Sequence, residues 1–566
     1  MDFVFALHSH LPYVLNHGRW PHGSDWLCEA AIDTYLPLIE ALTQLAREDV
    51  HAPVTIGVTP VLANQLAHPS FAAELEHLFD ERLKACARAP AELAETGQDD
   101  LIPLATFWRT RLERLRRLFR THGDIIAALR RFESAGRLEI ISSAATHGYL
   151  PLLGTEASIR LQLHVGYAEH RRLFGRPPRG CWLPECAYRP RGPWPVGGPH
   201  AVERPGIEEH LAAVGFRYFF TDSHLAAAGT PLGAYHDVPL GAERFDAERH
   251  GDVPAKRDGG VAAHRSPYWS YRISAPGAQE VRAFVRDPHS SMQVWSRDRG
   301  YPGDEWYLEF HKIRWPGGLK LWRVTGPHVD LGGKLSYAPD VAESRASEHA
   351  RHFTHVLQGL AAEHATVGDV IVAPFDTELF GHWWFEGIHF IADLYRALAR
   401  VPSVRPVTGT AHLRRHPRPP GIRLSEGSWG ANGDHSMWLN DSTRWTWDRL
   451  WPLEQRFWRA ARAAIGIEAL RPVVAQAARE MLLAQSSDWQ FVISTGVAAD
   501  YAERRFVGHC EAAEGLMDAM EPDATPEVRR RAEDAAATLR VRDDVFPDVL
   551  ASVQAVLDAE LDLATR

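Results

Sequence analysis

The sequence predicts an α/β fold, a parallel seven-stranded barrel close to the TIM type with a helical insertion and a C-terminal helical domain. Seven short apolar runs alternate with stretches of helical periodicity, and residues 64–136 are helical in pattern almost throughout. From residue 444 onward, Ala and Leu recur at helical spacing between long charged faces. We therefore expect a barrel over residues 1–420 and a helical domain over 421–566.

Length and composition set the broad class. A chain of 566 residues is too long for one core, so two or three domains are expected. The 45% hydrophobic and 24% charged content is ordinary for a globular protein. A net charge of −10 argues against a general nucleic-acid binder, and no apolar run reaches the roughly 18 residues that would cross a membrane.

The N-terminus and the cysteines indicate the compartment. The first residues lack a basic region and a small-residue cleavage site, so they are expected to form a first strand and not a signal peptide. The five cysteines show no zinc-type spacing. Both features predict a protein of the reducing cytoplasm without a disulfide framework.

Tryptophan is the informative residue in the composition. Many of the 19 tryptophans lie in Gly/Pro-rich stretches and not on periodic helices. Rigid aromatic faces in loops suit a ligand with flat apolar faces and a polar rim, such as a sugar ring. The alternative interpretation, packing at domain joints, fits part of them.

The first half of the barrel begins with a strongly apolar strand at residues 3–7, followed by His8 and His10. Histidines at i and i+2 on a strand point the same way, so they either bind a metal with further ligands or hydrogen-bond a substrate, and the second interpretation is favoured. A helix over about 29–47 and a strand over 54–58 follow. After the helical insertion, the strand at 138–142 leads into His147.

The fourth strand is the most informative. After a helix at 156–174, the buried run 181–183 ends at Pro184 and then presents Glu185. Proline cannot donate a backbone hydrogen bond, so the strand stops there. Glu185 is therefore expected at the carboxyl end of a strand, where α/β barrels place their chemistry.

The next stretch alternates strands with loops. A Pro/Gly-rich loop at 189–206 precedes a helix at 207–214 and a strand at 217–222. Residues 225–265 lack periodicity and carry Tyr235, which is typical of a lid or binding loop. A sixth strand at 281–285 is followed by a stretch at 291–303 that contains Trp295 and is expected to be an irregular aromatic loop.

The seventh strand repeats the pattern of the fourth. After a helix at 344–363, the apolar run 369–373 meets Pro374 and ends in Asp376. A helix at 390–400 closes the alternation, and residues 401–440 are rich in Pro, Gly and Trp. Two carboxylates after two strands, flanked by Trp, are what glycosidic bond cleavage needs, one as nucleophile or base and one as acid. The alternative for each is an ordinary barrel-end acid paired with an arginine.

These residues also carry a family resemblance that covers essentially the whole chain. Its signature stretches, in order, are 8–13 (HSHLPY), 146–149 (THGY), 180–185 (GCWLPE), 220–224 (FTDSH), 374–384 (PFDTELFGHWW) and the loop with Trp429 and Trp438. The chain resembles glycoside hydrolase family 57 and, within it, the 1,4-α-glucan branching enzymes.

The resemblance implies a (β/α)7 barrel and a retaining double displacement. Glu185 matches the nucleophile, which attacks the anomeric carbon of an α-1,4 linkage. Asp376 matches the general acid/base, which protonates the departing glucan and later deprotonates a glucose 6-hydroxyl to give an α-1,6 branch. Retention implies two carboxyl groups about 5–5.5 Å apart.

The resemblance also implies substrate contacts. His10, His147, Trp295, Trp429 and Trp438 match positions expected to line the sugar subsites, the last two contributed by the C-terminal domain. Tyr235 matches a tyrosine on a mobile loop that covers the site. Such a lid would exclude water while the glycosyl-enzyme waits, and an unchanged ratio of transfer to hydrolysis in Tyr235→Ala would contradict it.

Three alternatives stay open. A 4-α-glucanotransferase or an α-amylase of the same family would use the same carboxylates with another acceptor. A metal-dependent deacetylase on a seven-stranded barrel would use His8 and His10 as ligands, which metal analysis would test. A non-catalytic glucan-binding protein is the third. We expect a cytoplasmic enzyme of glycogen biosynthesis, monomeric or homodimeric, with an α-glucan substrate and with no metal, cofactor, nucleic acid or membrane as partner.

Overall fold

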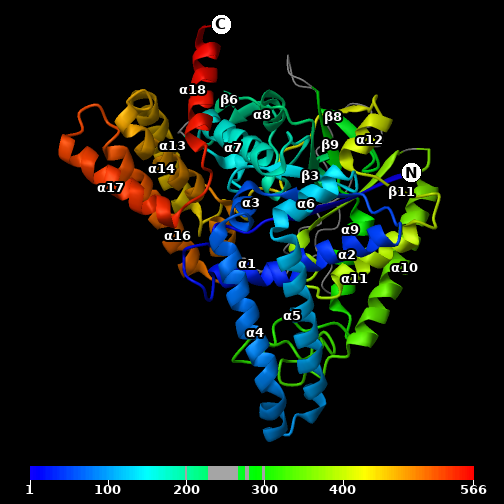
Figure 1. Ribbon diagram of the computed structural model, residues 1–566. Helices are drawn as coiled ribbons and strands as arrows, with labels where there is room; N and C mark the ends of the chain where they lie inside the picture. The colour runs from blue at the N-terminus through cyan, green and yellow to red at the C-terminus, as the bar shows by residue number, and fades with distance from the viewer. Residues whose placement is uncertain (198–200, 227–264, 274–279, 296–299, 367, 566) are drawn as a thin grey trace. The chain divides into compact units, whose positions relative to one another are not determined.

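The structure is a computed structural model that describes residues 1–566 apart from 198–200, 227–264, 274–279, 296–299, 367 and 566 (Figure 1). The chain forms two compact units, each assembled from three separate segments. The first unit comprises Met1–Ser142, Ala168–Gly180 and Asp287–Pro417, and the second comprises Ser143–Tyr167, Cys181–Arg286 and Arg418–Arg566. Among the described residues, no helix combines the length and the apolar character that a bilayer crossing requires.

The seven predicted strands are confirmed. They are β1 (Asp2–Ser9), β2 (Val54–Val58), β3 (Leu138–Ser143), β4 (Gly180–Trp182), β7 (Tyr218–Thr221), β9 (Val281–Val285) and β10 (Val370–Asp376). Almost every residue of these strands is buried, because helices alternate with the strands along the chain and leave neither face to solvent. The predicted α/β class is therefore confirmed.

In the first unit, β10, β1, β2 and β3 lie side by side in that order and run parallel. The short β11 (Arg405–Pro406) pairs with the start of β1. The register of β1 and β10 aligns His8 with Asp376. The polar residues that end these two strands are therefore neighbours at one edge of the sheet.

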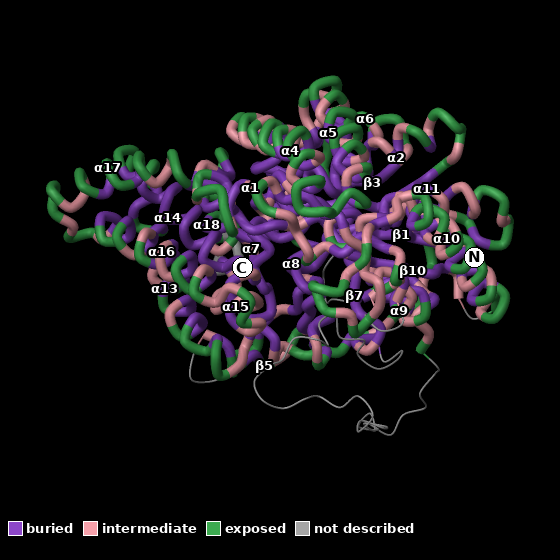
Figure 2. Tube along the Cα trace, turned by 90° about the horizontal axis from the view of Figure 1, so that it is seen from below, coloured by how far each residue is buried: buried purple, intermediate pink, exposed green. Residues whose placement is uncertain are grey.

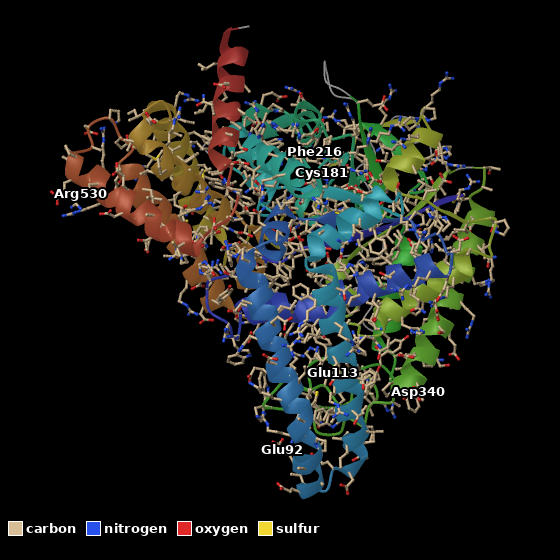
Figure 3. All side chains as sticks on the ribbon, viewed as in Figure 1. Glu92, Glu113, Cys181, Phe216, Asp340 and Arg530 are labelled. Atoms are coloured by element: carbon tan, nitrogen blue, oxygen red, sulfur yellow. The ribbon has the colours of Figure 1, made fainter. Side chains whose placement is uncertain are left out.

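The predicted helical insertion forms four helices, α3 (Pro60–Leu66), α4 (Pro69–Glu95), α5 (Ile102–His122) and α6 (Ile125–Ser134). Figure 1 shows α4 and α5 side by side, and they contact each other along their length. Apolar residues such as Phe79 and Leu115 are buried, whereas Glu113 is exposed and Glu92 is partly exposed; Figure 3 labels both glutamates. The pair is thus two amphipathic helices packed along their apolar stripes.

The remaining helices of the first unit flank its strands. They are α1 (Ser24–Ala30), α2 (Leu36–Arg47), α9 (Pro288–Trp295), α10 (Pro339–Glu363), α11 (Gly387–Leu398) and α12 (Gly409–Arg415). The prediction of an irregular loop after the sixth strand is wrong where α9 forms. Asp287 caps this helix, because its carboxylate accepts hydrogen bonds from the backbone N–H of His289 at 3.3 Å and of Ser290 at 2.7 Å. Pro288 occupies the first turn, where its missing N–H costs nothing.

In the second unit, β4, β7, β9, β8 (Ser270–Ile273) and β12 (Gly421–Ile422) are neighbours in that order. β7 and β9 run parallel, and β8 is antiparallel to β9. The region predicted as a loop at 189–206 contains a small antiparallel pair, β5 (Gly192–Trp194) and β6 (Val202–Arg204). The predicted helices α7 (Glu156–Phe174) and α8 (Ile207–Val214) are present, and the division between the units falls within α7.

The predicted C-terminal helical region is also present. Its helices are α13 (Arg444–Ala464), α14 (Arg471–Ala484), α15 (Ser487–Thr495), α16 (Ala499–Asp518), α17 (Pro526–Arg542) and α18 (Val549–Thr565). Every residue of α14 from Val473 onward is buried, so α14 is the central helix of this region. By contrast, α17 is mostly exposed (Figure 2). The boundary at residue 420 stays a prediction.

Candidate active site

Glu185 stands on an unusual backbone in the second unit. Beyond β4, Pro184, Glu185 and Cys186 form one tight turn, in which Glu185 has φ of 59° and Cys186 has φ of 48°. Non-glycine residues adopt this left-handed conformation at an energetic cost, which the surroundings must offset. The backbone N–H of Trp429 donates to the backbone carbonyl oxygen of Glu185 at 3.0 Å and so helps to fix the turn.

Three side chains surround the Glu185 carboxylate, which is only 8% exposed. The indole N–H of Trp429 donates to Oε2 at 2.9 Å, and the Ser487 hydroxyl donates to Oε1 at 3.3 Å. His147 Nδ1 lies 3.7 Å from Oε1 and 2.9 Å from the same serine oxygen. Donors aimed at a buried carboxylate stabilise its charged form and fix its orientation.

His147 is held as firmly as Glu185. Its φ is 59°, and its carbonyl oxygen accepts the Ser487 N–H at 3.2 Å. The preceding Thr146 N–H donates to Gln162 Oε1 at 3.1 Å, and Gln162 Nε2 donates to Gln485 Oε1 at 2.9 Å. These bonds connect the loop after β3, helix α7 and the start of α15, so the second unit supplies a rigid setting for Glu185.

Aromatic rings complete this setting. Trp429 packs edge-on against Trp182 with ring centroids 5.5 Å apart. Trp438 stacks on Tyr149 at 4.5 Å, and the Tyr149 hydroxyl hydrogen-bonds His435 Nδ1 at 2.9 Å. Trp429 and Trp438 are 1% and 0% exposed, so both are packed against protein in this structure. Their predicted contact with sugar stays a prediction.

A buried ion pair lies beside this aromatic cluster. The Arg286 guanidinium donates to both oxygens of Asp222, at 3.3 and 2.5 Å, and it lies 5.9 Å from the Trp429 ring. Burial alone would raise the pKa of Asp222, but Arg286, His224 and the Ser223 backbone N–H together outweigh it and the pKa falls to about 2. Asp222 therefore stays ionised and holds Arg286 near the ring of Trp429, which in turn donates to Glu185.

Trp429→Phe tests the hydrogen bond to Glu185. Phenylalanine keeps most of the ring but loses the N–H, so we expect kcat to fall about 10- to 100-fold, the range of one hydrogen bond to a charged group. Steady-state kinetics on amylose would measure the change. The matched control is Trp451→Phe, which removes an indole donor that bonds the Leu152 carbonyl oxygen at 2.8 Å. Equal losses in both variants would contradict a specific role for the Glu185 bond.

In the first unit, Asp376 ends β10 and is partly exposed. Its strand partner in the register is His8. The next residue, Thr377, hydrogen-bonds Ser9 through the two hydroxyl groups at 2.8 Å, which fixes the carboxyl ends of β10 and β1 together. Trp295, at the end of α9, packs near Phe375 with ring centroids 6.2 Å apart. The first unit thus gathers Asp376, His8, His10 and Trp295 at one end of its strands.

His10 is positioned by a buried acid that the sequence did not single out. Its Nδ1 lies 3.0 Å from the Thr59 hydroxyl, and its backbone N–H donates to Glu378 Oε1 at 3.3 Å. The Tyr35 hydroxyl donates to the same oxygen at 2.5 Å. Burial raises the pKa of Glu378 to about 7, although these hydrogen bonds lower it in part.

Glu378→Gln is expected to change the pH dependence of stability. A carboxyl whose pKa is raised on folding binds its proton more tightly in the folded chain, so its stabilising effect is lost as the pH rises from the ordinary pKa of 4.5 to the raised pKa of about 7. The melting temperature of the wild type should therefore fall relative to the variant between about pH 4.5 and 7, and the difference should stay constant above that range. Thermal melts across this range measure the difference, with the exposed Glu343→Gln as control. Parallel wild-type and variant curves would contradict it.

A second buried acid supports the loop after β10. Asp33 accepts from Lys320 Nζ at 3.1 Å and lies 3.4 Å from His382 Nδ1. Burial tends to raise the pKa of Asp33, but Lys320 and His382 lower it well below its usual range. Gly381 has φ of +115°, and a Cβ there would lie 2.1 Å from the Asp33 carbonyl oxygen. Only glycine fits this close approach.

The structure therefore places the predicted residues in two groups. Glu185, His147, Trp429 and Trp438 belong to the second unit, and His10, Trp295 and Asp376 belong to the first. Tyr235 lies outside the described residues. Sequence reasoning missed Ser487, Tyr35 and Glu378; of these, only Glu378 stood within a quoted motif.

Comparisons with known proteins identify the family. The model of glycosyl hydrolase family 57 matches residues 4–424, and the model of the C-terminal region of 1,4-α-glucan branching enzymes matches residues 452–553. The 1,4-α-glucan branching enzyme TK1436 of Thermococcus kodakarensis is 40% identical over 517 residues, which cover 89% of this chain and 72% of that protein. A probable 1,4-α-glucan branching enzyme of Mycobacterium tuberculosis is 30% identical over 94% of each chain.

Solved structures agree over nearly the whole chain. The crystal structure of the Thermococcus branching enzyme has a TM-score of 0.85 at 36% identity and covers 98% of this chain and 96% of its own. The branching enzyme of Pyrococcus horikoshii gives 0.84 at 34% identity, covering 98% and 96%. The α-amylase AmyC of Thermotoga maritima gives 0.76 at 27% identity, covering 97% and 99%. These matches confirm the predicted fold, and the chain belongs to glycosyl hydrolase family 57.

Proposed function

We propose that this chain is a 1,4-α-glucan branching enzyme, a glycosyltransferase that cleaves α-1,4 linkages and transfers the glucan segment to a 6-hydroxyl. The observation that carries this proposal is that two family models match successive parts of the chain. The family model covers residues 4–424, and the branching-enzyme C-terminal model covers residues 452–553. An α-amylase or a 4-α-glucanotransferase would use the same carboxylates, and activity separates them.

In the proposed reaction, Glu185 attacks the anomeric carbon and forms a covalent glycosyl-enzyme. Asp376 protonates the departing glucan and then takes the proton of the acceptor hydroxyl. The donors around Glu185 support its role as nucleophile, because Trp429 and Ser487 each donate to one carboxylate oxygen and so hold the carboxylate in one orientation. The partial exposure of Asp376 supports proton exchange with substrate and solvent.

We assign the substrate contacts to His10, His147, Tyr235, Trp295, Trp429 and Trp438. Water is present at about 55 M, so transfer requires that these residues and the bound glucan keep it from the glycosyl-enzyme. We also place the enzyme in the cytoplasm, in glycogen biosynthesis, as a monomer or homodimer. Five free, buried cysteines support a reducing compartment.

The deciding experiment incubates the protein with amylose and follows α-1,6 linkages by proton NMR before and after isoamylase digestion. New α-1,6 signal that isoamylase removes, and that Glu185→Gln does not produce, supports branching. Loss of long chains without α-1,6 signal would assign an amylase or a 4-α-glucanotransferase instead. No change in the amylose would reject all three activities.

A further inference from the structure

Four metal-ligating side chains gather in the first unit at the amino ends of its strands. Asp2 begins β1, and Asp369 immediately precedes β10, whose Val370 is paired with Asp2. His412 lies on α12 (Gly409–Arg415), and His416 follows four residues later, directly after the end of the helix. The full length of β10 separates Asp369 from Asp376, roughly 23 Å at the usual rise per strand residue. This cluster is therefore remote from Asp376.

The ligand atoms of three of these residues converge. Asp2 Oδ2 lies 3.1 Å from His412 Nδ1 and 3.3 Å from His416 Nε2, and the three atoms lie within 4.8 Å of one another. The two imidazole rings are stacked with centroids 4.4 Å apart. The Asp2 carboxylate thus faces one nitrogen of each ring.

These separations fit a tetrahedral metal ion. Bonds of about 2.0–2.1 Å from zinc to nitrogen or oxygen, at tetrahedral angles, place the ligand atoms about 3.3–3.4 Å apart. The two distances from Asp2 Oδ2 already match this spacing to within about 0.3 Å. The two histidine nitrogens lie within 4.8 Å of each other, so they need to approach by at most about 1.5 Å to complete the third edge.

Asp369 occupies the position of an orienting carboxylate. Its Oδ2 lies 3.1 Å from His416 Nδ1, and its Oδ1 lies 3.6 Å from His412 Nε2. These are the ring nitrogens that do not face Asp2. A carboxylate on the far nitrogen fixes the tautomer of a ligating histidine and raises its basicity, and most histidine–metal sites contain such a partner.

Two arginines also approach Asp2 and would compete with a cation. Arg415 Nε lies 3.3 Å from Oδ2, and Arg405 Nη1 lies 3.7 Å from Oδ1. Their side chains are 46% and 52% exposed, whereas that of Asp2 is 4% exposed. Either guanidinium can rotate into water when an ion binds, because about half of each arginine side chain is already exposed. His416, at 30% exposure, leaves the cluster open to solvent on one side.

We propose that Asp2, His412 and His416 bind one divalent transition-metal ion, with Zn²⁺ as the natural occupant and water as the fourth ligand. Two imidazoles and one carboxylate are a donor set that zinc accepts readily. Bound metal would fasten the first strand to α12 and stabilise the first unit, since the unfolded chain does not assemble the ligands. This structural site goes beyond the proposed branching activity and departs from the expectation of a metal-free protein.

The test uses the full-length, tag-free protein, stripped with a chelator and dialysed against buffered Zn²⁺ or Co²⁺. We expect one ion per chain by elemental analysis, tetrahedral Co²⁺ bands in the visible spectrum, and a higher melting temperature with Zn²⁺. His416→Asn should weaken binding at least about 100-fold by removing a ligand, and Asp369→Asn about 10- to 100-fold by removing the orienting carboxylate. The exposed His355→Asn on α10 is the matched control and should bind normally.

Each outcome decides the proposal. A wild type that retains no metal overturns it, whatever the variants do. Equal binding by His416→Asn and the wild type also overturns it. His10 lies at the other end of the strands. If His10→Gln lost the ion and His416→Asn retained it, the metal would be bound at His10. That result would reject both this site and the glycosidase assignment. Thermal melts of each variant in metal-free buffer show whether weaker binding comes from the missing ligand or from an unfolded chain.

Discussion

Glu185→Gln is expected to lower kcat for branching by at least about 10⁴-fold, because the amide cannot attack the anomeric carbon and no covalent intermediate forms. The substitution keeps the size of the side chain and its acceptor oxygen. The bond from Trp429 or Ser487 can therefore persist, and the fold should be preserved. Branching assays by NMR and thermal melts would measure the two effects separately.

A second variant identifies the role of Glu185 and not only its importance. Glu185→Ala opens space beside the anomeric carbon, and added azide can then attack in place of the carboxylate. With an activated α-maltosyl donor, the expected product is the β-glycosyl azide, which shows attack from the face that Glu185 occupied. Formation of the α-azide, or no response to azide in a folded protein, would argue that Glu185 is not the nucleophile.

The matched control for Glu185 is another buried carboxylate of the second unit. Glu208 is 5% exposed and accepts the Tyr188 hydroxyl at 2.8 Å. Glu208→Gln changes one buried acid to an amide in the same way, so it should affect the melting temperature and leave kcat within a few-fold of the wild type. A loss of activity as large as that of Glu185→Gln would mean that packing, and not nucleophilic attack, explains both.

The seven main strands could be predicted because each is an apolar run bounded by polar or Gly/Pro residues. The strands β5, β6, β8, β11 and β12 contain two to four residues that mix Gly, Pro or polar residues with apolar ones, so none of them forms an apolar run. Helix α9 was missed for another reason. Its Asp-Pro start is a helix signal, but the aromatic and serine-rich sequence that follows is also typical of a loop.

Within the candidate site, sequence reasoning found the residues that lie next to strand ends. Glu185 and Asp376 each follow a proline that ends or interrupts an apolar run. Ser487 could not be found in this way, because it bonds Glu185 from 302 positions further along the chain and begins a helix of ordinary composition. The left-handed backbone of Glu185 and His147 was equally hidden, since a glutamate rarely adopts it and a histidine, although it adopts it more often, does so in only a small share of cases.

The buried acids show the same limit. Glu378 lies in a stretch that the sequence singled out, yet its pKa is raised by burial and lowered in part by the hydrogen bond from Tyr35, 343 positions away. The three proposed metal ligands and Asp369 likewise come together from distant parts of the sequence. His412 and His416 have metal-ligand spacing, but Asp2 and Asp369 join them only because β1 and β10 pair in parallel.

Asp376→Asn is the second substitution with a large expected effect. A positioned general acid contributes about 10²- to 10⁴-fold, so kcat on amylose should fall by that factor. The loss should depend on the leaving group. α-Maltosyl fluoride needs little protonation to depart, so Asp376→Asn should form the glycosyl-enzyme from it at nearly the wild-type rate. The exposed Asp340→Asn, labelled at its position in Figure 3, is the control and should behave as the wild type with both donors.

The two substitutions together separate the two carboxylates by chemistry. If Asp376 is the acid and base, its variant accumulates glycosyl-enzyme with the fluoride donor, because the acceptor hydroxyl is no longer deprotonated in the second step. Azide needs no base, so it should release that intermediate as the α-azide, whereas Glu185→Ala gives the β-azide. Opposite anomers from the two variants follow only from a double displacement in which Glu185 forms the covalent bond and Asp376 moves the proton. The same anomer from both, or an equal loss with amylose and fluoride in Asp376→Asn, would exclude that assignment.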